Sequence, residues 1–445
     1  MRTAAALLGA LLAGSCGGGG ADLPNVVLLS LDTLRADHLS CYGYGIPTSP
    51  ELDTFAAGAT RWTECYSTAP WTLPAHASLF TGLFPGEHGA HTTQLAPDRS
   101  TVRPLEEDFV TLAEVLRAEG YATQAFVTNK VFLAKRLGLD QGFDDYRVRF
   151  RSAGKLGEIA TRFLRREHDR PFFLFLNYMD THRPYRSNER PGLLPRPVGR
   201  DSAELLDELY EPVLSGSLEP GDDRLERLID QYDTAIANLD EELGRLFDGL
   251  RQLGLFEDAL IVVTSDHGEY FGEHDLIEHS KDVYRAGLHV PLLVKEPGQR
   301  EGRVETRPIS LAEVPALILQ ALPEEVRRRH ADTFRRDLPV VAENHYSRTR
   351  DLALEPWGVR FRRVRRLLRH GPLEYIDSSD QNHELYDLSS DPEERENRLA
   401  GDADRAAELA RRLGAIVAGW RPAPQGRGIT DWTEQERADL DHLGY

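Results

Sequence analysis

Two apolar segments of the sequence lead into side chains that can bind a metal ion. Residues 25–31 run directly into Asp32, and residues 260–264 are followed closely by Asp266 and His267. Apolar runs of this length are typical of buried strands, and the ligands of open α/β sheets collect at the carboxyl ends of strands. Carboxylate oxygens and imidazole nitrogens suit divalent ions from magnesium to zinc. The sequence therefore predicts a site for calcium, magnesium, manganese or zinc with these three side chains as ligands.

A hydroxyl on a proline-containing segment is the candidate nucleophile. Thr72 stands two residues before Pro74. A free hydroxyl is a poor nucleophile, but coordination to a metal lowers its pKa and presents an alkoxide for in-line attack on sulfur or phosphorus. The alternative is that Thr72 caps a helix that begins near Pro74. The two interpretations are compatible, because a helix N-terminus also favours a tetrahedral anion.

The elements that must position these residues alternate along the chain between apolar, β-rich runs and helical periodicity. Because strands that alternate with helices pair in parallel and are covered on both faces, we expect an α/β fold: a three-layer αβα sandwich with a mostly parallel central sheet. Apolar residues recur every three or four positions over residues 225–250, which predicts a helix packed on that sheet. The clearest strands are predicted at residues 25–31, 122–127, 171–178, 259–264 and 290–294, and a further helix at residues 110–119.

The strongly charged stretch at residues 323–337 indicates a domain boundary. Beyond it, short β-rich runs predict a small antiparallel C-terminal subdomain that ends in an amphipathic helix. Its strands are expected at residues 339–343, 358–370 and 373–377, and its helix at residues 405–420. The predicted organisation is an export segment at residues 1–20, a catalytic domain at 24–330, the subdomain at 336–421 and a tail with little pattern at 422–445.

The N-terminus has the pattern of an export signal. Its apolar stretch, Ala4–Ala13, is too short to span a bilayer. The small residues before Cys16 resemble the lipobox of bacterial lipoproteins, which implies a lipid anchor on that cysteine. Ala13 replaces the usual large aliphatic residue, and a plain signal cleaved elsewhere is the alternative. We expect an exported bacterial protein, periplasmic or membrane-anchored, whose only membrane attachment is this anchor.

The formal net charge of −19 repels polyanions, and this excludes nucleic acid as an expected partner.

Most of the chain, from about residue 25 to residue 388, resembles the sulfatase family of the alkaline phosphatase superfamily. The matching motifs follow in order at residues 31–37, 41–43, 74–82, 264–269, 271–274 and 384–388, the last followed by Asp391-Pro392. The resemblance implies Asp32, Asp266 and His267 as metal ligands and Thr72 as the nucleophile.

The resemblance also implies residues that handle the anionic group of an ester. His182, in a segment that resembles the family's His-x-Pro-Tyr element, is implied to bind the anion or to protonate the leaving group, with a purely structural histidine as the alternative. His279 and Lys281 compete for a further contact to the anion. The family's Gly-Lys-Trp-His element is absent, and Asn129 and Lys130 stand near its place.

Three positions depart from the family pattern. Thr72 stands where typical sulfatases have the Cys or Ser that becomes formylglycine, and His76 stands where they have Arg. Thr33 replaces the second Asp of the usual pair. His76 therefore joins Thr72 and His182 as a catalytic candidate.

The expected function is hydrolysis of a sulfate or phosphate ester of a small molecule, glycan or lipid. The phosphoryl ester is favoured on chemical grounds, because a threonyl phosphate can be hydrolysed with metal help whereas a threonyl sulfate has no hemiacetal through which to eliminate. Two alternatives stay open. One is a non-catalytic lipoprotein that binds an anion or glycan on a sulfatase fold, and the other is a phospho-group transferase.

Overall fold

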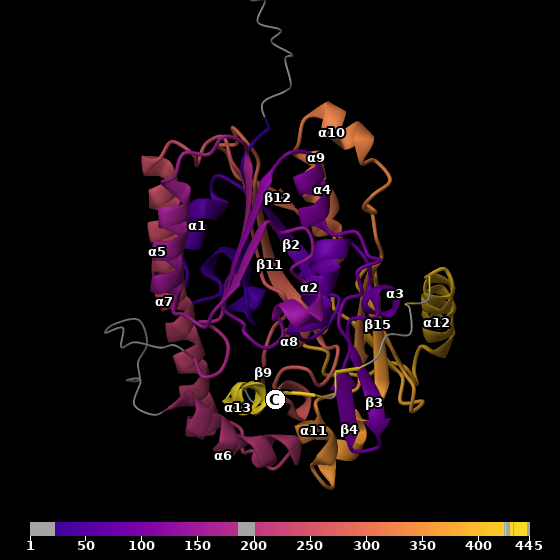
Figure 1. The fold of residues 1–445 in the computed structure, drawn as a ribbon. Helices are drawn as coiled ribbons and strands as arrows, with labels where there is room; N and C mark the ends of the chain where they lie inside the picture. Colours follow the sequence, from indigo (N-terminus) through magenta and orange to yellow (C-terminus); the bar gives the residue numbers. More distant parts are fainter. Residues whose placement is uncertain (1–22, 186–200, 422, 424–427, 430, 443–445) are drawn as a thin grey trace, which may run out of the picture.

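The computed structural model describes residues 23–185, 201–421, 423, 428–429 and 431–442. The predicted export segment with Cys16 lies outside the described residues. A nine-stranded sheet forms the centre (Figure 1). Its order is β12 (Arg303–Glu305), β2 (Thr60–Tyr66), β11 (His289–Lys295), β8 (Leu260–Thr264), β1 (Val26–Leu31), β7 (Phe172–Tyr178), β5 (Ala122–Val127) and β6 (Asp145–Val148), with β13 (Ile309–Ser310) also paired to β2.

The strand pairs of this sheet are parallel except for β11, which runs antiparallel to both β2 and β8. The prediction of a mostly parallel sheet is therefore confirmed, and the predicted strands differ from the observed ones by at most a residue at either end.

Side chains of the central strand β1 point alternately into two separate cores, as the twofold periodicity of a strand requires. Val27, Leu29 and Leu31 belong to one core, and Val26 and Leu28 to the other. The first core is completed by α1 (Pro50–Ala56), α5 (Ala153–Leu164), α6 (Ser202–Leu214) and α7 (Asp223–Gln252). The second is completed by α2 (Thr72–Thr81), α4 (Leu112–Ala118) and α9 (Val314–Gln320). Figure 1 shows α5 and α7 on one side of the sheet and α2 and α4 on the other, which are the outer layers of the predicted sandwich.

A second sheet, which is antiparallel throughout, forms the predicted C-terminal unit. It contains β14 (Val340–His345), β15 (Val364–His370), β16 (Leu373–Ser378) and β17 (Glu384–Asp387), and α12 (Ala403–Ala418) packs on it. The strand predicted at 358–370 is shorter than expected, because residues Trp357–Phe361 form a 3₁₀ helix. β17 coincides with a motif at 384–388 whose strand character the sequence analysis did not assign.

The remaining elements are short. They are α3 (Pro85–His88), the hairpin β3 (Thr92–Ala96) and β4 (Arg99–Val102), β9 (Tyr270–Phe271), β10 (Ile277–Glu278), α8 (Arg285–Leu288), α10 (Glu324–Arg329), α11 (Thr349–Ala353) and α13 (Glu434–His442). The region expected to be a tail with little pattern thus contains a helix, α13. In the part of the chain described here, no helix combines the length and apolar character that a membrane crossing requires.

Candidate active site

The two predicted metal-binding segments meet because their strands are neighbours. β1 lies between β7 and β8, with Ser30 opposite Thr264 in the register. Asp32 follows the last residue of β1, and its backbone N–H donates to the carbonyl of Tyr178 at 2.9 Å. Parallel strands end at the same edge of a sheet, so Asp32 and Asp266 are brought to the same place.

Asp32, Asp266 and His267 form a compact cluster of possible ligands. One atom from each lies within 4.8 Å of the others, and all three side chains are fully buried. His267 Nε2 is 3.7 Å from Asp32 Oδ1 and 3.4 Å from Asp266 Oδ2. Among the described residues, no group hydrogen-bonds to either of these two carboxylate oxygens. Buried carboxylate oxygens without hydrogen bonds are costly, and a divalent cation between them removes that cost.

The raised pKa values of the two carboxylates also indicate a site for a cation. Burial, together with the charge of Asp266, raises the pKa of Asp32 to about 8, and burial raises the pKa of Asp266 to about 7. Among the described ion pairs, the only basic groups beside these two carboxylates are the imidazoles of His76 and His267. The donor set therefore fits a divalent metal ion.

The backbone around His267 orients its imidazole toward the carboxylates. Its Nδ1–H donates to the carbonyl of Gly268 at 2.9 Å, which leaves the lone pair of Nε2 on the side of the cluster. A side chain at Gly268 is excluded, because its Cβ would lie 2.0 Å from the carbonyl oxygen of Ala286. This close approach explains why the segment needs a glycine after the histidine.

Thr33 does not replace the carboxylate that the family pattern has at this position. Its hydroxyl donates to the carbonyl of Thr181 at 2.6 Å, and its backbone N–H donates to Asp266 Oδ1 at 3.2 Å. The residue therefore holds Asp266 in position through its backbone.

Thr72 lies next to this cluster at the first position of α2. Its Oγ1 is 3.4 Å from His267 Nε2 and 3.5 Å from Asn129 Nδ2, and the side chain is fully buried. The residue that precedes the helix is Trp71, and no side chain caps the helix at that position. The hydroxyl is therefore directed toward the metal-binding cluster, at the N-terminus of a helix.

His76 supports the first turn of α2 from inside the fold. Its Nδ1 is 2.9 Å from the carbonyl oxygen of Thr72, and its Nε2 is 2.9 Å from Ser30 Oγ. Burial lowers the pKa of His76 to about 3, so the ring is neutral at ordinary pH. Its Nδ1 also lies 3.4 Å from Asp266 Oδ2. These contacts place His76 behind Thr72, and its neutral ring does not replace the charge of an arginine.

Asn129, and not Lys130, is brought to the cluster. The Asn129 amide nitrogen donates to Asp32 Oδ2 at 3.1 Å, and its Oδ1 accepts from the backbone N–H of Phe132 at 2.9 Å. The Lys130 ammonium instead contacts Asp439 of α13 at 2.5 Å. Asn129 and Lys130 follow β5 in the loop beyond its end, and their side chains have different partners, so that only Asn129 reaches the cluster.

This difference leads to a test of the two residues. Asn129→Ala removes a donor to Asp32 beside Thr72, and we expect kcat/KM to fall about 10²-fold. Lys130→Ala breaks a partly exposed ion pair, and its effect should be at least about tenfold smaller. Steady-state kinetics of both variants measure this, with Asn382→Ala at an exposed position as the matched control. An equal or larger loss in Lys130→Ala would show that the lysine reaches the substrate.

A row of histidines extends from the cluster. The ring of His279 lies 4.8 Å from that of His267 and 4.9 Å from that of His182. His182 Nδ1 is 2.8 Å from the carbonyl oxygen of Arg183, and burial lowers the pKa of His182 to about 3. The structure thus brings His182 and His279 to the same site as Asp32, Asp266 and His267.

Glu269 is a site residue that the sequence analysis did not single out. Its Oε1 lies 2.9 Å from His279 Nδ1, and both side chains are fully buried. Burial raises the pKa of Glu269 to about 7. Its place directly after the predicted Asp-His-Gly segment was the available signal. Lys281, the competitor of His279, lies 3.6 Å from the carboxylates of Glu278 and Asp351.

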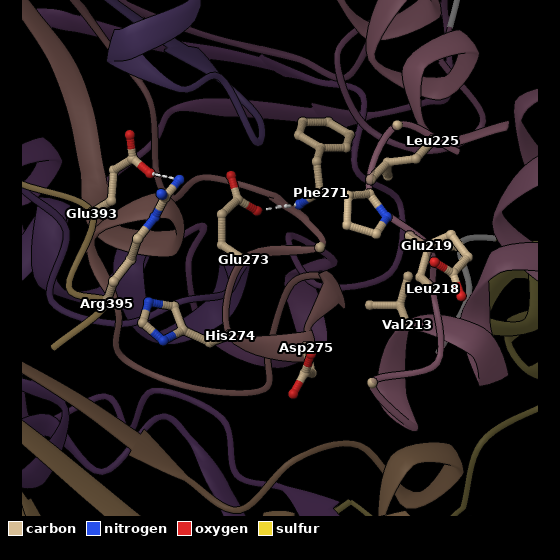
Figure 2. Close-up of a pocket in the computed structure, with 14 residues that line it drawn as sticks. Val213, Leu218, Glu219, Leu225, Phe271, Glu273, His274, Asp275, Glu393 and Arg395 are labelled. Atoms are coloured by element: carbon tan, nitrogen blue, oxygen red, sulfur yellow. Dashed lines mark hydrogen bonds and ion pairs between the residues drawn. The ribbon is translucent and has the colours of Figure 1, made fainter. Parts of the chain in front are cut away.

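A cleft lies outside this site. It has a volume of about 520 Å³, and its walls come from the α6–α7 connection, residues 271–275 and the segment near Glu393 and Arg395 (Figure 2). None of the candidate site residues lines it. The carboxylates of Glu219, Glu273, Asp275 and Glu393 outnumber the one guanidinium, of Arg395, among the side chains labelled in Figure 2, and this disfavours an anionic ester there.

The family model described as Sulfatase matches residues 24–324. The chain belongs to the sulfatase family. This confirms the resemblance, and the protein is a sulfatase-family hydrolase that acts on ester bonds.

Individual relatives of this sulfatase-family chain are distant but extend over most of its length. Human arylsulfatase A is 28% identical and the alignment covers 88% of this chain and 86% of that protein. A multifunctional alkaline phosphatase superfamily protein of Trinickia caryophylli is 26% identical over 92% of this chain and 97% of its own. Among solved structures, the phosphonate monoester hydrolase of Agrobacterium radiobacter superposes with a TM-score of 0.65 at 21% identity, covering 93% of this chain and 98% of that chain, and has the same fold.

Proposed function

We propose that the protein is a metal-dependent hydrolase in which Thr72 attacks a phosphate ester, with a sulfate ester as the less favoured substrate. The observation that carries the proposal is the position of Thr72 Oγ1, 3.4 Å from His267 Nε2 and beside two carboxylates whose facing oxygens have no hydrogen bond among the described residues. A multifunctional superfamily relative and a phosphonate monoester hydrolase with the same fold are consistent with a phosphoryl reaction.

Asp32, Asp266 and His267 would hold the divalent metal. When bound, the ion supplies positive charge that lowers the pKa of a neighbouring hydroxyl and offsets the charge of the ester. The chain contributes the rest. Asn129 orients Asp32, and the N-terminus of α2 presents Thr72 with its first backbone N–H groups toward the anion.

The reaction proceeds in two displacements. The Thr72 hydroxyl gives its proton to solvent as Oγ1 forms a bond to phosphorus, and the bond from phosphorus to the alcohol oxygen breaks. The departing alcohol takes a proton from His182. Its imidazole is neutral in the free protein, and an anionic ester beside it raises its pKa so that it binds a proton. Water then attacks phosphorus and returns a proton to His182. The bond from phosphorus to Oγ1 breaks, phosphate is released, and Thr72 Oγ1 takes back a proton from solvent.

The choice between sulfate and phosphate is tested by turnover of three aryl substrates: a sulfate, a phosphate monoester and a phosphate diester. Each is assayed with magnesium, calcium, manganese and zinc. We expect a phosphate ester to be the best substrate, because a threonyl sulfate lacks the elimination route that an aldehyde hydrate provides. Preference for the aryl sulfate would contradict the phosphoryl assignment. Tight metal binding without turnover of any ester would favour the non-catalytic alternative, and transfer of phosphate to an added alcohol would favour the transferase.

A further inference from the structure

A small, mainly apolar cavity lies beside the segment that carries Thr72. Its volume is about 240 Å³. Its walls are formed by Trp71, Thr92, Ser100, Thr101, Val102, Phe132, Ser280, Tyr346, Arg348, Thr349, Trp432 and Leu440. None of these residues belongs to the metal-binding cluster, so the cavity is a separate feature next to it.

The cavity borders the reactive residues from two sides. Trp71 is bonded to Thr72, and Ser280 stands between His279 and Lys281. The two loops meet where the backbone N–H of Ser280 donates to the carbonyl of Pro70 at 2.9 Å. Since Thr72 itself is fully buried, an ester whose phosphorus reaches it must place its alcohol portion in adjacent space.

The lining of the cavity favours an apolar ring. The rings of Trp71 and Phe132 pack edge to face with their centroids 5.4 Å apart. The Arg348 guanidinium in the wall already donates to Glu278 and Asp351, so its charge is balanced. The hydroxyls of Thr92, Ser100 and Thr101 in the wall already donate to backbone carbonyls. A sugar would lose the hydration of several hydroxyls here without gaining those donors in return.

One polar group of the wall is available to a ligand. The Ser280 hydroxyl is buried, with the residue only 3% exposed, and it has no hydrogen-bond partner among the described residues. This combination suits a ring that carries a single oxygen at its edge. A cavity of about 150 Å³ is enough for benzene in another protein, so 240 Å³ accommodates a phenyl-sized group.

The outer wall comes from the C-terminal part of the chain. Ile429 donates its backbone N–H to the carbonyl of Val102 at 2.8 Å, which adds the segment to the edge of the β3–β4 hairpin. The guanidinium of Arg136 lies 4.2 Å from the centre of the Trp432 ring and forms an ion pair with Glu436 at 3.1 Å. These contacts hold Trp432 and α13 in place, so that Trp432 and Leu440 face the cavity.

We propose that this cavity is the subsite for the alcohol portion of the ester, and that Trp432 and Leu440 make the enzyme select a hydrophobic, ring-sized alcohol over a small or sugar alcohol. The inference deepens the proposed function and rests on it for the identity of the ligand. It assigns a specificity role to a region beyond the residues matched by the family model.

The test measures binding and not only turnover. In the full chain carrying Thr72→Ala, with magnesium or zinc present, calorimetry compares phenyl phosphate with methyl phosphate. We expect phenyl phosphate to bind at least about tenfold more tightly. Adding Trp432→Ala or Leu440→Ala should remove most of that preference and leave the affinity for methyl phosphate within about twofold. Leu253→Ala, at a position that is 37% exposed, is the matched control and should change neither affinity.

A second kind of substitution distinguishes loss of the cavity from loss of the folded structure in Trp432→Ala and Leu440→Ala. Leu440→Trp fills the cavity instead of enlarging it, and it should weaken phenyl phosphate while sparing methyl phosphate. Equal affinity for the two esters in the Thr72→Ala protein, or a preference that survives both the enlarging and the filling substitutions, would overturn the subsite. A phenyl preference in binding together with no turnover by the unmodified protein would refute the hydrolase mechanism and leave the subsite intact.

Discussion

Thr72→Ala is expected to lower kcat/KM for the best phosphate ester by at least about 10³-fold while the protein stays folded. The substitution removes the only hydroxyl that lies beside both His267 and Asn129 among the described hydrogen bonds, and with it the atom that attacks phosphorus. The side chain is small and makes only long contacts through Oγ1, so we expect the free energy of unfolding to fall by only about 1 kcal/mol. Steady-state kinetics and chemical denaturation measure the two effects separately.

Two further variants define what the Thr72 result means. Thr72→Ser keeps a hydroxyl at the same position and should retain far more activity than Thr72→Ala. Thr54→Ala makes the same chemical change at an exposed helical position and should leave kcat/KM unchanged. Full activity in Thr72→Ala would rule out the threonine mechanism, since no other described hydroxyl occupies that position.

Asp266→Asn is expected to abolish metal-dependent stabilisation together with turnover. In the unmodified protein, metal at about 100 times its dissociation constant should add about 2.7 kcal/mol to the free energy of unfolding. The variant loses one of three ligands and should show little of this gain. With the metal removed by a chelator, the variant should be more stable than the unmodified protein. The reason is that replacing a buried carboxylate by a neutral amide of similar shape relieves its repulsion with Asp32. Thermal unfolding with and without metal measures both effects.

The same repulsion makes a pH dependence expected for the metal-free protein. The pKa of Asp32 is raised from 3.8 to about 8, so its ionised form disfavours the folded state. The contribution of this group to stability should therefore be greatest below pH 3.8, and it should decline as the pH rises toward about 8.

The control for Asp266→Asn is Asp248→Asn, at an exposed ion pair, which should not alter the response to metal. An Asp266→Asn protein that metal stabilises as strongly as the unmodified one would place the ion elsewhere.

Much of the fold was predictable because its signals are local. The apolar runs before Asp32 and Asp266 are long enough to be strands and contain no charged residue, and the observed strands β1 and β8 end within a residue of the predicted positions. The stripe of apolar residues in α7 likewise follows from the helical period alone. The 3₁₀ helix at Trp357–Phe361 was not predicted, since a short turn of this kind leaves no periodic pattern in the sequence.

The candidate site divides in the same way. By itself, the sequence determined which residues stand at strand ends and that Thr72 lies near a helix start, because these depend on neighbours along the chain. Only the tertiary structure decided that Asn129 rather than Lys130 meets Asp32, and that Glu269 pairs with His279. Which of two adjacent side chains faces inward depends on the register of packed elements.

The tertiary structure also decided where residues 431–442 lie. Nothing in the pattern after residue 422 indicates the wall of a cavity, yet Trp432 and Leu440 line the same cavity as Trp71, which lies more than 300 positions away in sequence. The physical reason is that strand and helix signals arise from short-range periodicity, whereas a cavity is bounded by surfaces that only the packing of remote segments brings together.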